Sequence, residues 1–93
     1  MIQEIIVKKY MWSGVLDHIS LIVKYESDRV FTRSYHDIRE IPYTFRDFLE
    51  SAEIEDVREI IPEHTPYSIL QTTYRRVRIN ETMRDMQEQE DWM

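Results

Sequence analysis

The hydrophobic pattern of the first residues is typical of a buried β-strand. Residues 5–7 are three consecutive β-formers, Ile-Ile-Val, so residues 2–11 are predicted to form a strand with apolar side chains on both faces. Such a strand fits a central position in a sheet. A turn is expected over residues 12–14, which contain the only glycine of the chain.

The next segments continue as alternating strands. Over residues 18–26 the side chains of Ile19, Leu21, Val23 and Tyr25 fall on one face, and mostly polar residues fall on the other. Residues 26–29 then form a hairpin loop, and residues 29–36 return as a third strand. The pattern therefore predicts an antiparallel meander.

From residue 44 the apolar spacing changes to that of a helix, and we predict helical structure over residues 44–61. Thr44 can cap this helix, and Asp47 in the first turn would favour the helix dipole. Steps of 100° per residue place one stripe toward the core, made of Phe45, Phe48, Leu49 and Ala52.

A second apolar stripe lies on a different side of the same predicted helix: Ile54, Val57, Ile60 and Ile61. One straight helix cannot direct both stripes into one core. Either the chain bends near residues 51–54 into two short helices, which we favour, or one helix bridges two apolar surfaces, one of them on a partner.

Residues 68–79 fit two patterns. As a strand they contain many β-branched residues, with Ile69, Thr73, Val77 and Ile79 on one face. As a helix they have Thr65 as a cap and Pro66 at the first position. We favour the strand, and we predict a polar helix or tail for residues 81–93.

Together these elements predict an α+β fold. It consists of a small antiparallel β-meander of three or four strands, with one bent helix or two short helices packed on it and a polar C-terminal helix. At 93 residues the chain is expected to form one domain, over residues 1–80, followed by an acidic C-terminal segment at 81–93.

Composition argues against several classes of function. The chain has no cysteine, which removes disulfides, thiolate metal sites and cysteine nucleophiles. A single glycine does not suffice for the common phosphate-binding loops. His18, His36 and His64 fall in different elements without metal-ligand spacing. We therefore expect no cofactor, no metal and no catalytic site, and keep an enzyme with an unrecognised site as a lesser alternative.

Charge separates along the sequence. Residues 34–66 carry nine acidic and three basic residues, residues 67–80 carry three arginines and no acid, and residues 81–93 carry five acidic residues and one basic residue. A net charge of -6 is unfavourable for direct binding of nucleic acid, which requires clustered Lys and Arg.

The acidic middle suggests a surface that engages a basic partner, because spaced carboxylates can occupy the positions of phosphates in a basic groove. We expect the contacts to come from Glu50, Glu53, Glu55, Asp56 and Glu59, with Trp92 as an apolar anchor. The structural alternative is a solvated helix face. In length and charge alone, the chain resembles the small acidic inhibitors of phages and other mobile elements, including DNA mimics and anti-CRISPR proteins. That resemblance implies a basic, nucleic-acid-processing protein as partner.

A small nucleic-acid-binding regulator is the second hypothesis. It would use the basic strip of Tyr74, Arg75, Arg76 and Arg78, an aromatic platform beside guanidinium groups. Against it, the same arginines can neutralise acidic groups of the chain itself.

No segment approaches ~20 apolar residues, so we expect an intracellular, cytoplasmic protein without membrane contact. A homodimer through an open sheet edge is a further expectation.

Overall fold

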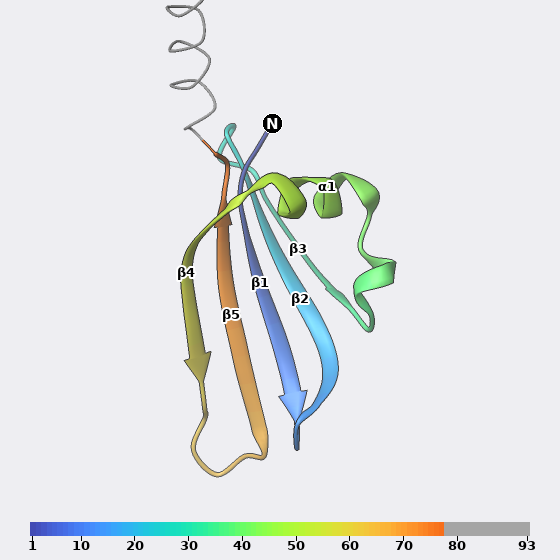
Figure 1. The fold of residues 1–93 in the computed structure, drawn as a ribbon, viewed down its shortest axis with the longest axis vertical. Helices are drawn as coiled ribbons and strands as arrows, with labels where there is room; N and C mark the ends of the chain where they lie inside the picture. The colour runs from blue at the N-terminus through green and yellow to red at the C-terminus, as the bar shows by residue number, and fades with distance from the viewer. Residues whose placement is uncertain (78–93) are drawn as a thin grey trace, which may run out of the picture.

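The computed structural model describes residues 1–77, which form a five-stranded antiparallel sheet with one α-helix on one face (Figure 1). The strands are β1 (Ile2–Trp12), β2 (Val15–Tyr25), β3 (Val30–Tyr35), β4 (Glu53–Ile60) and β5 (Tyr67–Arg75). A short 3-10 helix, η1 (Ile38–Glu40), and the helix α1 (Tyr43–Ser51) connect β3 to β4. The predicted α+β class and antiparallel meander are confirmed, but the sheet has five strands rather than three or four.

The order of the strands in the sheet is β3-β2-β1-β5-β4, so the N-terminal strand is central, as its apolar run predicts. The first three strands are joined by tight hairpins. Ser13 and Gly14 form the first turn with φ angles of 49° and 83°. Two consecutive positive φ angles are what a two-residue hairpin turn with the right twist requires.

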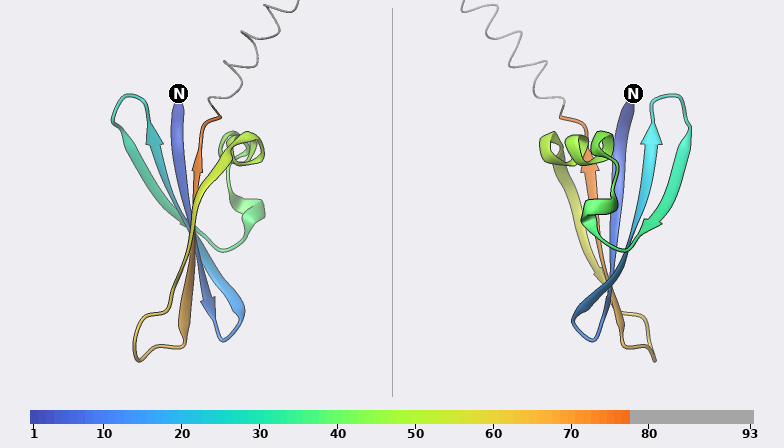
Figure 2. Two further views of the ribbon diagram at one scale, coloured as in Figure 1. Left: turned by 60° about the vertical axis from the view of Figure 1, so that its left-hand side comes forward. Right: turned by 90° about the vertical axis from the view of Figure 1, so that its right-hand side faces the viewer.

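The chain must then cross the sheet, because β3 and β4 lie at opposite edges. Four gaps between neighbouring strands correspond to about 19 Å. η1 and α1 span this distance on one face, which we call the helix face; the opposite face is the open face (Figure 2). At η1, Asp37 caps the first turn by accepting a hydrogen bond from the backbone N–H of Arg39 (3.0 Å).

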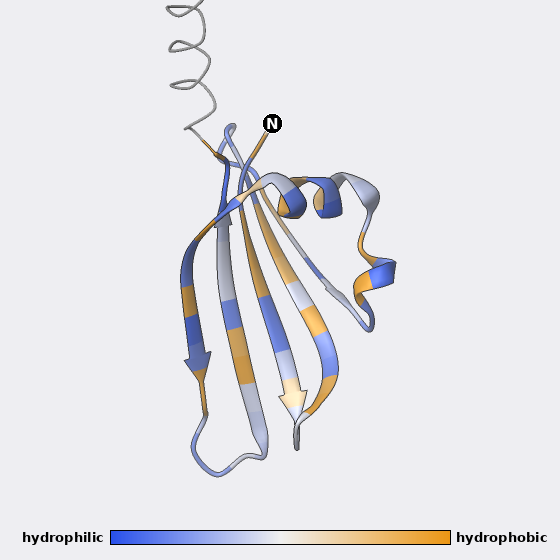
Figure 3. Ribbon diagram, in the orientation of Figure 1, coloured by the Kyte–Doolittle hydropathy of each residue, from blue (hydrophilic) through white to orange (hydrophobic). Residues whose placement is uncertain are grey.

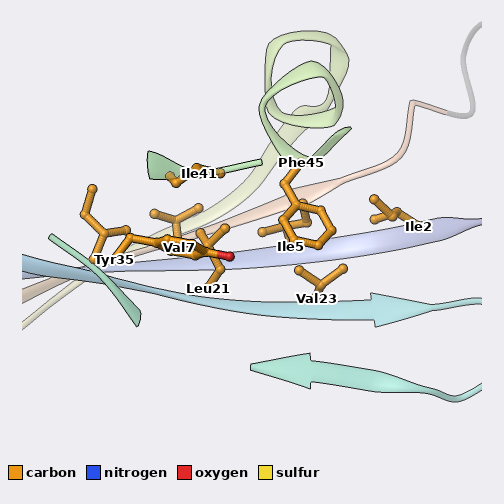
Figure 4. Packing of buried hydrophobic residues seen from close by; sticks show 9 residues of the cluster. Ile2, Ile5, Val7, Leu21, Val23, Tyr35, Ile41 and Phe45 are labelled. Atoms are coloured by element: carbon orange, nitrogen blue, oxygen red, sulfur yellow. The ribbon is translucent and has the colours of Figure 1, made fainter. Parts of the chain in front are cut away.

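The core lies between α1 and the three strands of the meander (Figure 4). Phe45 points from α1 toward Ile5 and Val23, and Ile41 lies above Val7. The ring of Phe45 also lies 5.6 Å from that of Phe31 on β3, centroid to centroid. Three members of the predicted core stripe are confirmed, since Phe45 is buried and Phe48 and Leu49 pack against the same cluster; the fourth, Ala52, follows the end of α1.

The second half of the predicted helix 44–61 is wrong. Helix α1 ends at Ser51, Ala52 is extended, and residues 53–60 are strand β4. Helix α1 also begins one residue earlier than predicted, at Tyr43, with Pro42 at the N-cap and no side-chain cap, so Thr44 does not cap it. The first turn contains no acidic residue, and Asp47 therefore lies too far along to act there.

A β-bulge explains why the second apolar stripe looked helical. Ile54 pairs with Tyr74 and Asp56 pairs with Thr73, so Glu55 is an extra residue. A bulge shifts the alternation by one position. Ile54 and Val57, three residues apart, therefore lie on the same face of the strand, which is the spacing of a helix.

Residues 68–79 are predicted as a strand in preference to a helix, and β5 confirms the strand over residues 68–75. Ile69 and Thr73 lie on one face of it, as predicted, while Val77 follows the end of the strand. The polar C-terminal helix predicted for residues 81–93 lies outside the described residues.

Candidate protein-binding edge

Strand β4 forms one edge of the sheet, beside β5 alone (Figure 1). In an antiparallel pair every second residue turns its N–H and C=O away from the partner strand. Along β4, the N–H and C=O groups of every second residue therefore face away from β5. Its β-branched residues suit a strand, and its hydropathy alternates along the edge (Figure 3).

Four of the five predicted partner-binding carboxylates are brought together on this edge: Glu53, Glu55, Asp56 and Glu59. They belong to a strand, not to a helix surface as predicted. Directly paired residues of a sheet share a face. Glu53 pairs with Arg75 and Asp56 with Thr73, on the open face, whereas Glu59 pairs with Leu70 on the helix face. Glu50 lies exposed on α1, and Trp92 lies outside the described residues.

Two of these carboxylates already have cationic partners. Arg75 Nη1 lies 3.0 Å from Glu55 Oε1, and Arg58 Nε lies 2.7 Å from Asp56 Oδ2. Glu53 and Glu59 make no ion pair within residues 1–77. Strand β4 has four acidic residues and one basic residue, so its net charge is -3.

Apolar side chains on β4 are also exposed to solvent. Ile54 is 59% exposed and Val57 is 56% exposed. Both lie on the helix face, because Ile54 pairs with Tyr74 and Val57 with Thr72. Helix α1 covers the end of this face where β1 begins and leaves the other end open (Figure 2). The edge therefore combines exposed apolar side chains, excess carboxylates and open backbone groups.

The basic strip of residues 74–78 is divided by the fold. Tyr74 faces the helix and packs against the core, while Arg75 lies on the open face beside Glu4 (3.7 Å) and Glu55. Arg76 follows the strand and pairs with Glu26 across 2.8 Å. Arg78 lies outside the described residues. The two arginines of the strip that the structure describes, Arg75 and Arg76, thus pair with carboxylates of the chain itself.

Sequence reasoning missed an aromatic cluster on the open face, near the hairpin that joins β1 to β2. The rings of Tyr10 and His18 are stacked at 4.2 Å, and the ring of Trp12 meets that of Tyr67 edge-on at 4.4 Å. Asp17 Oδ2 lies 2.7 Å from His18 Nδ1. The sequence did contain a signal for this cluster. Tyr10 and Trp12 occupy even-numbered positions of the strand, whereas the core residues Ile5 and Val7 occupy odd-numbered positions, so the two pairs lie on opposite faces.

A groove of about 680 Å³ opens at the other end of the sheet, where β1 begins and β5 ends. Its wall is mixed in character and consists of Met1, Ile2, Tyr25, Thr44, Asp47, Phe48, Ser51, Ala52, Arg76 and Val77.

Titratable chemistry is sparse in the described residues. Hydrogen bonds from the Arg39 side chain, and then from its backbone N–H, hold the pKa of Asp37 below its ordinary value. In residues 1–77, no group of three or more His, Asp or Glu side chains lies close enough together to hold a metal ion. Nor does that part of the chain contain a helix long and apolar enough to cross a membrane.

Comparison with protein-family models, with curated proteins and with solved structures finds no match to this chain. The class of protein is therefore defined by the fold alone: a small α+β protein with a five-stranded antiparallel sheet and one covering helix.

Proposed function

We propose that this chain is a non-enzymatic binding protein that engages a basic protein partner through the acidic edge of its sheet. The observation that carries the proposal is the composition of β4, where four carboxylates lie beside three exposed apolar side chains, Ile54, Val57 and Ile60, on an edge strand. Surface charge of one sign attracts a partner of the opposite sign and speeds association, and exposed apolar side chains add contact area.

The partner class that fits this charge is a protein with a phosphate-binding groove, such as a nucleic-acid-processing enzyme. Carboxylates on a rigid strand can occupy such a groove and exclude its substrate. The protein then acts as an inhibitor or regulator. The small size and net charge of -6 support the same class of action.

The proposal is tested by affinity capture from a lysate of the source cell, at low salt and again at about 1 M salt, where surface charges are strongly screened. The double variant Glu53→Lys, Glu59→Lys changes the two carboxylates of β4 that have no ion pair in residues 1–77. The control is Glu63→Lys, in the loop after β4, whose side chain is 93% exposed.

We expect the wild type and the control to retain the same basic protein, and the double variant to lose it, as all three do at high salt. Circular dichroism should be unchanged by the substitutions. The proposed function is contradicted if the double variant retains that protein, or if the wild type captures no basic protein that is lost at high salt.

A further inference from the structure

The backbone at the outer edge of β4 is available to another strand. β4 is eight residues long, against six for β3 at the opposite edge. Among the described residues, no turn, loop or side-chain hydrogen bond involves the backbone of residues 53–60. A row of open N–H and C=O groups on an edge strand is a template for a further strand.

Strand β4 has two of the features that protect such an edge, a bulge and charged side chains, and lacks two others. Proline and lysine discourage edge pairing, and β4 contains neither. Its bulge at Glu55 lies near one end, so residues 56–60 remain a regular stretch. At the other edge, β3 carries a single charged residue, Arg33, so the two edges of the sheet differ in charge.

The side chains of β4 specify the pattern of an incoming strand. An added residue opposite Ile54 or Val57 would share the helix face with them, so an apolar side chain fits there. A residue opposite Asp56 or Glu53 would lie on the open face beside a carboxylate, so a basic side chain fits there. Over residues 53–57 the complementary strand therefore alternates basic and apolar residues, whereas Arg58 on the open face favours an acidic residue, Glu59 on the helix face a basic one and Ile60 an apolar one.

Charge also argues against a second copy of this edge as the occupant. Pairing β4 with β4 of another molecule would bring together two strands that each carry a net charge of -3. Like charges opposite each other destabilise a pair of strands. A basic segment from a different protein meets the same edge with favourable charge.

We propose that β4 binds an extended segment of the partner as a sixth strand of the sheet, and that the part of this segment opposite residues 53–57 alternates basic and apolar residues. This inference rests on the proposed function and gives it a binding mode. The backbone supplies hydrogen bonds along the strand, and the alternation of side chains selects the sequence.

The test uses four synthetic peptides, each as long as the eight-residue strand β4. The first alternates valine and lysine, and the second has the same composition as a block of lysines followed by a block of valines. The other two repeat the alternating sequence with N-methyl groups at the valines or at the lysines. N-methylation removes a backbone donor without changing charge. Binding is measured by calorimetry, and amide exchange of β4 by NMR.

We expect the alternating peptide to bind at least about tenfold more tightly than the block peptide, a difference of about 1.4 kcal/mol. Only one set of N–H groups of an added strand faces β4, so the two N-methylated peptides should differ by a similar factor. Amide exchange in residues 53–60 should slow when the alternating peptide is bound.

Equal binding of all four peptides overturns the strand-addition mode while leaving the proposed function intact, because charge alone would then hold the partner. If no peptide binds while capture of the partner still depends on Glu53 and Glu59, the strand-addition mode is likewise overturned and the proposed function stands. Self-association of the free chain with protected β4 amides would identify a second copy as the occupant and also overturn the inference. The proposed function itself fails only in the capture experiment.

Discussion

Arg75 Nη1 lies 3.0 Å from Glu55 Oε1, which joins β5 to the bulge of the edge strand β4. The same guanidinium group lies 3.7 Å from Glu4 of the central strand. Arg75 thus offsets part of the negative charge beside the edge that we propose as the binding surface.

Replacement of this arginine should strengthen binding of a basic segment. Arg75→Gln leaves Glu55 without its cation, so the affinity for the alternating valine–lysine peptide should rise by about two- to fivefold at low salt. The control Arg33→Gln makes the same change of charge on β3, at the far edge. Calorimetry measures the affinity of both variants. An equal rise in affinity would mean that the net charge of the protein, and not the position of Arg75 beside the edge, controls binding.

The same substitution should cost little stability. Both side chains are more than 40% exposed, at 49% for Arg75 and 41% for Glu55. Exposed ion pairs contribute less than about 1 kcal/mol. Urea unfolding of Arg75→Gln, Glu55→Gln and the double variant gives the coupling energy directly, and a value well above this bound would contradict a surface role.

Phe45 should be the main anchor of α1. Phe45→Ala removes a buried ring that packs on the meander, and a change of this kind lowers the free energy of unfolding by about 3–5 kcal/mol. Tyr43→Ala, on the same helix but 79% exposed, should change it by less than about 0.5 kcal/mol. Urea unfolding monitored by circular dichroism compares the two, and similar losses would mean that α1 packs differently.

Tyr35 has a buried hydroxyl with no hydrogen-bond partner among the described residues. Burial of a polar group without a partner is unfavourable, so Tyr35→Phe should leave stability unchanged or raise it by up to about 1 kcal/mol. The ring, and its contact with the Arg33 guanidinium at 5.7 Å, are retained. Thermal unfolding measures the change, and a clear loss of stability would show that the hydroxyl has a partner in solution.

The turn at η1 should weaken in acid. Arg39 lowers the folded-state pKa of Asp37, so the carboxylate contributes stability above its ordinary pKa of 3.8. That contribution is lost as the pH falls through the lowered value. Carboxyl titration by NMR should give a pKa below 3.8, and Arg39→Ala should return it toward 3.8. An unchanged value in the variant would exclude Arg39 as the cause.

Local pattern was sufficient for the first half of the fold. The apolar run at residues 5–7, the alternation after His18 and the turn around Gly14 predicted the first three strands, because each hairpin joins neighbours in sequence. The core stripe of α1 was also predicted, since a helix face depends on spacing alone. The acidic residues of the candidate site could likewise be read from the sequence, although their arrangement could not.

Strand β4 was decided by tertiary structure. Its segment is rich in acidic residues, which are depleted in strands, and the extra residue Glu55 gives Ile54 and Val57 a helical spacing. What makes it a strand is pairing with β5, which arrives later in the chain and brings Arg75 opposite Glu53. The sequence alone determined that this segment is acidic with apolar side chains at intervals. Only the fold made it an edge, because β5 pairs on its other side with β1, and pairing between strands far apart in the sequence leaves no local signal.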